Sequence, residues 1–159
     1  MVVVIQRISR AAVYADGVLT GSAGAGLYLL CGVEDGDTEK DAVLLAEKIR
    51  KLRIFNDERG KMNRSLADID GEVLVVSNFT LNAHYAHGNR PDYLASAKPE
   101  EATRLYLTFV DCLKQAGVRR VEAGVFGADM KTDLVTDGPV TIVMYSGTLG
   151  GNTAHVQER

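Results

Sequence analysis

The sequence predicts a single-domain α/β protein in which two main helices pack against a mixed, barrel-like β-sheet. The length of 159 residues suits one domain, and no linker divides the chain. Strand patterns occur at both ends and in the middle of the chain, separated by two amphipathic helices. Several strands for only two helices leave much of the sheet uncovered. This favours an oligomer, most simply a twofold dimer.

The composition excludes several classes of protein. With 46% hydrophobic and 25% charged residues, the chain is neither disordered nor fibrous. A net charge of −3 argues against a protein that coats nucleic acid through bulk positive charge. The N-terminus lacks the features of a signal peptide, and no apolar stretch reaches the roughly 20 residues that cross a bilayer. We therefore expect a cytoplasmic protein with no membrane partner.

The N-terminal part predicts a β-hairpin. Residues 2–7 form an apolar strand pattern, and β-prone runs follow at 12–15 and 18–20. The Asp16-Gly17 dipeptide between these two runs favours a type I′ turn, in which both central residues have positive φ.

A glycine-rich segment, Gly21–Gly26, follows this hairpin. Its glycines do not have the spacing of a dinucleotide-binding loop, and no Gly-Lys-Ser/Thr sequence closes it. The segment therefore predicts a turn into the apolar strand 27–33 rather than a phosphate site.

Two segments have the spacing of amphipathic helices. Asp37 or Thr38 can cap the first, and the second runs from about residue 100 to 116 with Gly117 as its stop. The first helix has one apolar face formed by Ala42, Leu45, Ala46, Ile49 and Leu52. The second has a face formed by Ala102, Leu105, Phe109, Leu113 and Ala116. We expect both faces to pack on the sheet.

The remaining strands include one that should be central. Residues 72–77 form a near-continuous apolar run, typical of a strand buried on both faces. Shorter strand patterns follow the second helix at 121–123, 134–135 and 140–145. From Ser146 the sequence is rich in Gly and Thr. We therefore expect a domain over residues 1–145 and a flexible tail over 146–159.

Two segments carry groups suited to chemistry. Ser77-Asn78-Phe79-Thr80 follows the buried strand and supplies two hydroxyls, while the backbone N–H groups of Phe79 and Thr80 could bind an anion. Alternatively, the hydroxyls only satisfy local backbone groups at a strand end. No Ser-His-Asp arrangement is evident. The second segment, residues 136–141, contains Gly138-Pro139, which is either a simple turn or bulge or a cis bond, a form that about 5–6% of X-Pro bonds adopt.

The histidines and cysteines do not indicate a metal site. His84 and His87 are spaced as a metal-binding pair would be on a helix, but their surroundings predict a solvated loop, and His155 lies in the expected tail. Cys31 and Cys112 are isolated and are interpreted as small buried hydrophobes.

Basic residues gather between Lys48 and Arg64. This stretch has a net charge of +5, against −8 for the rest of the chain. It could hold a few phosphates at a nucleic acid end, or it could be a solvated helix face followed by a polar loop. Its cations are Lys48, Arg50, Lys51, Arg53, Arg59, Lys61 and Arg64.

Residues 1–145 resemble the D-aminoacyl-tRNA deacylase family. The similar segments, in order, are residues 4–11, Arg53-Ile54-Phe55, Gly60-Lys61-Met62-Asn63, Arg90-Pro91 and Phe126-Gly127-Ala128-Asp129-Met130. Residues 77–80 and 136–141 fall where the family has its Ser-Gln-x-x-Thr and Asn-x-Gly-Pro-x-Thr motifs. Asn78 replaces the usual Gln and Thr136 the usual Asn, while His87 and Asp92 replace a Lys and a Ser.

The resemblance implies a homodimer that hydrolyses the ester between a D-amino acid and tRNA, and that also acts on glycine. It implies a catalytic segment of Ser77, Asn78, Phe79 and Thr80. The partner chain would supply a cis Gly138-Pro139, and Thr136 and Met130 would also bind substrate and select its chirality. Neither a metal nor an organic cofactor is expected.

Two mechanisms are consistent with this resemblance. Thr80 could be a covalent nucleophile, or the 2′-hydroxyl of the tRNA could help to activate water. We favour the second, because the sequence offers no evident base for Thr80. The alternatives from other classes are a non-catalytic protein that binds tRNA ends and a small-molecule esterase that uses Ser77 or Thr80.

Overall fold

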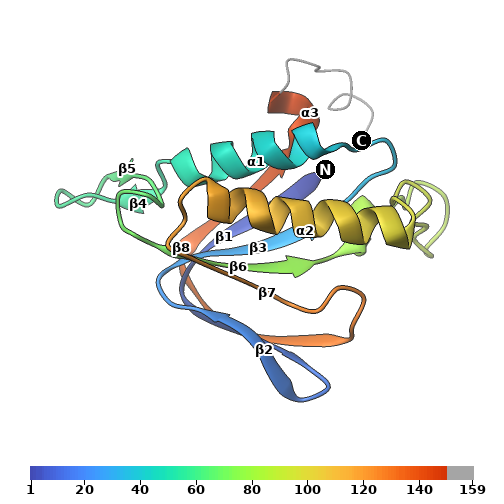
Figure 1. Ribbon diagram of the computed structural model, residues 1–159, viewed down its shortest axis with the longest axis horizontal. Coiled ribbons are helices and arrows are strands. Elements are labelled where there is room, and N and C mark those ends of the chain that lie inside the picture. The colour runs from blue at the N-terminus through green and yellow to red at the C-terminus, as the bar shows by residue number, and fades with distance from the viewer. Residues whose placement is uncertain (150–159) are drawn as a thin grey trace.

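A computed structural model describes residues 1–149 and confirms the predicted α/β class (Figure 1). In this part of the chain, six strands form a mixed sheet with the order β2-β1-β3-β6-β7. The sixth strand, β8, pairs with β1 along the edge opposite to the one shared by β2 and β3. The strands of this sheet are β1 (Val2–Ala15), β2 (Val18–Ala23), β3 (Gly26–Gly32), β6 (Glu72–Ser77), β7 (Arg120–Ala123) and β8 (Met130–Tyr145). The two main helices are α1 (Glu39–Lys51) and α2 (Pro99–Gln115).

The sheet combines antiparallel and parallel pairs. Strand β1 is antiparallel to β2, β3 and β8, while β3–β6 and β6–β7 are parallel. Helices α1 and α2 make the crossovers between the parallel strands and lie side by side on one face of the sheet. At the far side the edges of β2 and β7 approach each other, and the Ser22 N–H donates to Glu122 Oε2 at 2.6 Å. The sheet is therefore a nearly closed barrel.

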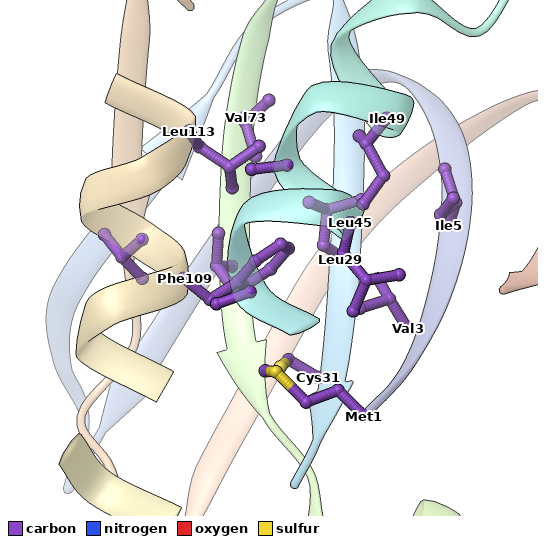
Figure 2. Close-up of a cluster of buried hydrophobic side chains, with 14 of the residues drawn as sticks. Met1, Val3, Ile5, Leu29, Cys31, Leu45, Ile49, Val73, Phe109 and Leu113 are labelled. Carbon is purple, nitrogen blue, oxygen red and sulfur yellow. The ribbon is translucent and has the colours of Figure 1, made fainter. Parts of the chain in front are cut away.

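Two hydrophobic clusters form the core. The larger one lies between the sheet and the helices, and Figure 2 shows Leu29 and Val73 of the sheet with Leu45 of α1 and Phe109 of α2. The smaller cluster fills the barrel interior and includes Ile8, Val13, Tyr28 and Leu74. Strand β6 is buried throughout residues 73–76, as expected of a central strand.

The hairpin prediction is confirmed, with a longer strand before it. Strand β1 is continuous over 14 residues where two runs were expected. Asp16 and Gly17 have φ of 50° and 78°, as a type I′ turn requires. The turn predicted over residues 21–26 is shorter than expected, because β2 extends to Ala23 and the chain reverses at residues 24–25.

Both predicted helices are present. Thr38 caps α1 and forms a capping box with Asp41, and all the residues expected on the α1 apolar face are buried except Leu52, the half-buried C-cap. Helix α2 begins with Pro99 in its first turn and ends at Gln115.

Strand β8 is a single strand of 16 residues with a bulge, where two short strands were expected. Gln6 of β1 pairs with Thr141 and Ile8 pairs with Thr136, so β8 advances five residues while β1 advances two. Residues 137–140 are therefore looped out of the ladder. The Gly138-Pro139 bond within this bulge is cis.

The polar stretch after Phe55 forms the loop of a small hairpin. Residues 57–61 connect β4 (Phe55–Asn56) to β5 (Met62–Arg64), so the loop is present with a short strand on either side. The tail expected from residue 146 begins as a short helix, α3 (Ser146–Leu149), in which Ser146 is buried. The rest of that expected tail, including His155, lies outside the described residues. No helix among residues 1–149 has the length and apolar character of a bilayer span.

Candidate active site

The end of the central strand β6 places Ser77 at a pocket. The ladder sets Ser77 opposite Cys31 of β3, and the Asn78 N–H donates to the Cys31 carbonyl at 2.8 Å. The chain then enters a 3₁₀ turn, η1 (Phe79–Asn82), for which Asn78 is the N-cap. The rigid sheet therefore fixes the start of the Ser77–Thr80 segment.

This pocket has a volume of about 180 Å³ and brings together the ends of several elements. Of the predicted site residues, Ser77, Asn78, Phe79 and Met130 line it, whereas Thr80 does not. The remaining lining residues are Cys31, Val33, Ser96, Ala97, Ala102, Phe126, Gly127 and Ala128. None of the described residues that line this pocket is a histidine, a lysine or a carboxylate.

Asn78 changes the expected pair of anion-binding N–H groups. Its side-chain oxygen accepts hydrogen bonds from the Thr80 N–H at 3.1 Å and from the Thr80 hydroxyl. The Thr80 N–H is therefore not free in this structure, because the short Asn side chain caps its own turn. The Phe79 N–H makes no hydrogen bond to another group within residues 1–149, and Phe79 lines the pocket, so this N–H is a candidate donor to a bound anion.

Asn82 fixes the 3₁₀ turn to the sheet, and the sequence analysis did not identify it. Its buried amide donates to the Val33 carbonyl at 2.7 Å and to Ser96 Oγ at 3.3 Å. Phe79 is 59% exposed at the rim of the pocket, where its ring lies edge-on to Tyr93 with the centroids 5.0 Å apart. In the sequence, the only feature that points to Asn82 is that it is a polar residue two positions after Thr80, and this spacing is not typical of any motif.

Met130 forms a wall of the pocket because Gly124 leaves room for it. A Cβ at Gly124 would lie 2.6 Å from Met130 Sδ, well inside ordinary contact. The Gly124 N–H donates to the Val75 carbonyl at 2.9 Å, which holds this backbone against the central strand. The position of the Met130 thioether thus depends on the absence of a side chain at residue 124.

Cys31 is the one cysteine in the pocket lining and is fully buried among the described residues. Burial raises the pKa of its thiol to about 12. The thiol stays protonated at neutral pH, so a thiolate nucleophile is not expected. The prediction of a small buried hydrophobe is confirmed for Cys31, whereas Cys112 is only partly buried.

The second predicted segment lies away from the pocket of its own chain. Thr136, Gly138 and Pro139 are exposed on β8, and none of them lines the pocket. Gly138 has a φ of 135°, and a Cβ there would lie 2.7 Å from the Val140 nitrogen. This position in the bulge therefore requires glycine.

Arg7 anchors the bulge and was missed as a functional residue. It is 6% exposed, its Nε lies 2.9 Å from Asp137 Oδ2 and 3.1 Å from the Asp137 carbonyl, and its Nη1 donates to the Ile54 carbonyl at 2.7 Å. A buried guanidinium with these partners rigidifies the segment it holds. The feature of the sequence that could have identified Arg7 is its position as a cation within the largely apolar run of residues 2–8.

His84 and His87, the two histidines among the described residues, lie at a separate hollow of about 260 Å³. His84, His87 and Asp92 line it, and the backbones of His84 and Asp92 form an isolated β-bridge. Within residues 1–149 no three His, Cys, Asp or Glu side chains are arranged to hold a metal ion.

Comparisons with known proteins agree on one family. The family model for D-Tyr-tRNA(Tyr) deacylase matches residues 4–145. A curated D-aminoacyl-tRNA deacylase of Geobacter sulfurreducens is 47% identical over 153 residues, which cover 96% of this chain and 100% of the relative. The protein of the same name from Akkermansia muciniphila is 51% identical over 146 residues, which cover 92% and 97%.

Two solved structures share the architecture. A structure titled c-Myc DNA Unwinding Element Binding Protein has a TM-score of 0.85 and 36% identity, covering 91% of this chain and 97% of that one. A probable eukaryotic D-amino acid tRNA deacylase has a TM-score of 0.78 at 15% identity, covering 90% and 97%, and therefore supports the fold alone.

Proposed function

This chain belongs to the D-aminoacyl-tRNA deacylase family, and from that premise we propose how its pocket hydrolyses the ester of D-aminoacyl-tRNA. The reaction releases free tRNA and the D-amino acid. The pocket at the end of β6 receives the aminoacyl ester and the terminal adenosine. The observation that carries this assignment is the open pocket lined by Ser77, Asn78 and Phe79, together with an exposed, anchored bulge on the same chain. We place the activity in the cytoplasm, where aminoacyl-tRNA is used.

The active protein is a homodimer in this proposal, and each pocket receives Gly138-Pro139 of the other copy. Within residues 1–149, β8 pairs on one edge only, with β1. The same strand carries two exposed apolar side chains, Val135 and Val143, which are 41% and 51% exposed in the single chain. An unpaired edge with exposed apolar side chains is a surface that association would cover. A twofold partner would also bring a second bulge, with its Thr136, toward the pocket.

A rigid backbone wall accounts for chiral selection. D- and L-aminoacyl esters present the same hydrogen-bonding groups, so the enzyme must discriminate by where the side chain can go. A thousandfold preference needs about 4 kcal/mol, whereas a soft hydrophobic pocket typically supplies about 1–3 kcal/mol. Backbone groups of the partner's bulge, anchored by Arg7, cannot yield as a side chain would. They hold the substrate amine and exclude an L side chain by steric conflict.

The chemistry relies on orientation and on stabilisation of the oxyanion. The Phe79 N–H donates to the oxygen that becomes negative in the tetrahedral intermediate. The Thr80 hydroxyl donates to Asn78 Oδ1, and a neutral amide oxygen cannot take its proton to create a nucleophile. We therefore assign the attack to water, assisted by the 2′-hydroxyl of the tRNA. The ester C–O bond breaks, and the proton passes to the departing ribose oxygen.

The same geometry admits a glycyl ester. Glycine has no side chain to meet the wall, so exclusion of L side chains gives no protection to Gly-tRNA. We propose that the enzyme hydrolyses glycine mischarged on a non-cognate tRNA as well.

Parallel deacylation assays test this function. Purified protein should hydrolyse D-Tyr-tRNA much faster than L-Tyr-tRNA at equal concentrations. Equal rates for the two isomers would refute chiral selection. Tight tRNA binding without turnover would indicate a binding protein, and equal turnover of simple esters would indicate a small-molecule esterase. Sedimentation equilibrium should give a dimer mass, and a monomer that retains full activity would refute the shared pocket.

A further inference from the structure

The chain carries a second surface for its substrate, which we define as the basic hairpin (residues 53–64). We propose that this hairpin binds phosphates of the tRNA acceptor end and does so at the pocket of the other subunit. The inference rests on the proposed dimer. It extends recognition of the substrate from the aminoacyl ester to the RNA backbone. Its cations are Arg53, Arg59, Lys61 and Arg64.

Asp57 builds the tip of the basic hairpin. Its Oδ1 accepts the Arg59 N–H at 2.9 Å and the Lys61 N–H at 3.0 Å, and its own N–H donates to the Lys61 carbonyl at 2.8 Å. These bonds use the carboxylate to shape the turn. The Arg59 and Lys61 side chains are therefore presented from a fixed backbone, which lowers the entropy lost on binding.

The cations at the tip are not engaged elsewhere. Arg59 and Lys61 are exposed, and neither takes part in an ion pair within the described chain. Arg53 donates to the Asn63 carbonyl at 2.7 Å and stiffens the base of the hairpin. Lys51, just before the hairpin, is by contrast paired with Glu47. Unpaired cations on a stiff arm in an acidic protein suit the phosphates of an RNA backbone.

Arg7 relates this hairpin to the active site. Its guanidinium contacts the Ile54 carbonyl at the root of the basic hairpin and Asp137 in the bulge. Figure 1 places β4 and β5 at one end of the sheet, whereas β6 points toward the opposite end, where Ser77 lies at the pocket. The basic hairpin is thus remote from the pocket of its own chain. If the bulge enters the other subunit's pocket, the hairpin is carried to the mouth of that pocket.

The variant Arg59→Gln/Lys61→Gln tests the contact with RNA. We expect its affinity for uncharged tRNA to fall about 25-fold to 60-fold at 0.1 M salt. The slope of log K against log salt concentration should become shallower by about 1.4 to 1.8, the change for two phosphate contacts. Hydrolysis of D-tyrosyl-adenosine, which has no such phosphates, should stay at the wild-type rate. The matched control Arg104→Gln/Lys114→Gln on α2 removes the same charge from another face and should leave tRNA affinity within about twofold.

Three results would overturn the proposal. They are unchanged tRNA binding by the hairpin variant, an equal loss in the α2 control, and an equal loss with D-tyrosyl-adenosine. Binding of uncharged tRNA does not depend on turnover. Absence of ester hydrolysis by the wild-type protein would therefore refute the proposed function without deciding the hairpin experiment.

Mixed dimers test the placement across subunits. One chain carries Ala128→Trp, which fills the pocket, and the other carries Arg59→Gln/Lys61→Gln. Two different affinity tags allow the mixed dimer to be isolated. The intact hairpin then faces the intact pocket, so the dimer should recover about half of the wild-type activity on D-Tyr-tRNA at subsaturating concentration. Activity of only about half that of the hairpin variant would show that each hairpin serves the pocket of its own chain.

Discussion

Substitution of Gly124 by alanine tests whether the wall at Met130 sets the size of the pocket. The added Cβ would lie 2.6 Å from Met130 Sδ, so the thioether must retreat by about 1 Å or more to reach an ordinary contact of roughly 3.5–4.0 Å. Gly124 has no positive φ, so the effect is steric. Because Sδ lies near the flexible end of its side chain, the loss of folding stability should be at the low end of about 1–3 kcal/mol for overpacking.

The open space next to the Met130 thioether is the pocket, so the displaced thioether moves into the pocket. A misplacement of about 1 Å can cost up to 100-fold in rate, or about 2.7 kcal/mol, when it affects how a substrate is positioned. We expect kcat/KM for D-Tyr-tRNA to fall 10-fold to 100-fold and that for D-Ala-tRNA to fall less than 5-fold, in single-turnover deacylation assays. Gly124→Ala/Met130→Ala should restore the activity on D-Tyr-tRNA. An equal loss for both substrates, or no rescue by the second substitution, would refute this role of Met130.

Three further predictions concern the residues around the pocket and the bulge. Arg7→Lys removes the guanidinium that joins Ile54 to Asp137, so it should lower the free energy of unfolding by about 2–3 kcal/mol in urea titrations. It should also reduce the ratio of D-Tyr-tRNA to L-Tyr-tRNA hydrolysis rates at least tenfold. An unchanged ratio would contradict the anchoring role of Arg7. Thr80→Ala should retain activity within about tenfold of wild type, whereas a trapped acyl-enzyme on Thr80 would overturn the water mechanism. Because the pKa of Cys31 is raised to about 12, iodoacetamide should leave this residue unmodified between pH 7 and 9, and Cys31→Ala should keep kcat within about twofold; loss of activity on alkylation of Cys31 would show that the thiol is ionised or accessible.

Local patterns in the sequence account for most of the fold. The Asp16-Gly17 turn, both apolar helix faces and the buried run at 72–77 are each encoded by a pattern of residues close in the chain, and such local patterns can be recognised from the sequence alone. The continuity of β1 and β8 was missed for the opposite reason. These strands continue through Ser9 and through the bulge because they pair with each other, and long-range pairing leaves little trace in either strand alone.

The candidate site divides in the same way. Ser77 and Asn78 were identifiable because Ser77 ends, and Asn78 follows, a strand whose burial is evident from its composition. The capture of the Thr80 N–H by Asn78 depends on a side-chain rotamer, which spacing does not specify. The roles of Arg7 and Gly124 depend on groups distant in the chain, Asp137 and Met130, that meet them only in the folded protein.

The most direct test of the shared pocket is a crystal structure of the protein with a non-hydrolysable D-tyrosyl-adenosine analogue. We predict one analogue per pocket, with its ester mimic near the Phe79 N–H of one subunit and its amine in hydrogen-bond contact with backbone of residues 137–139 of the other. An analogue bound with those residues facing solvent, or contacted by residues 137–139 of the same chain, would contradict selection of handedness by a neighbouring subunit.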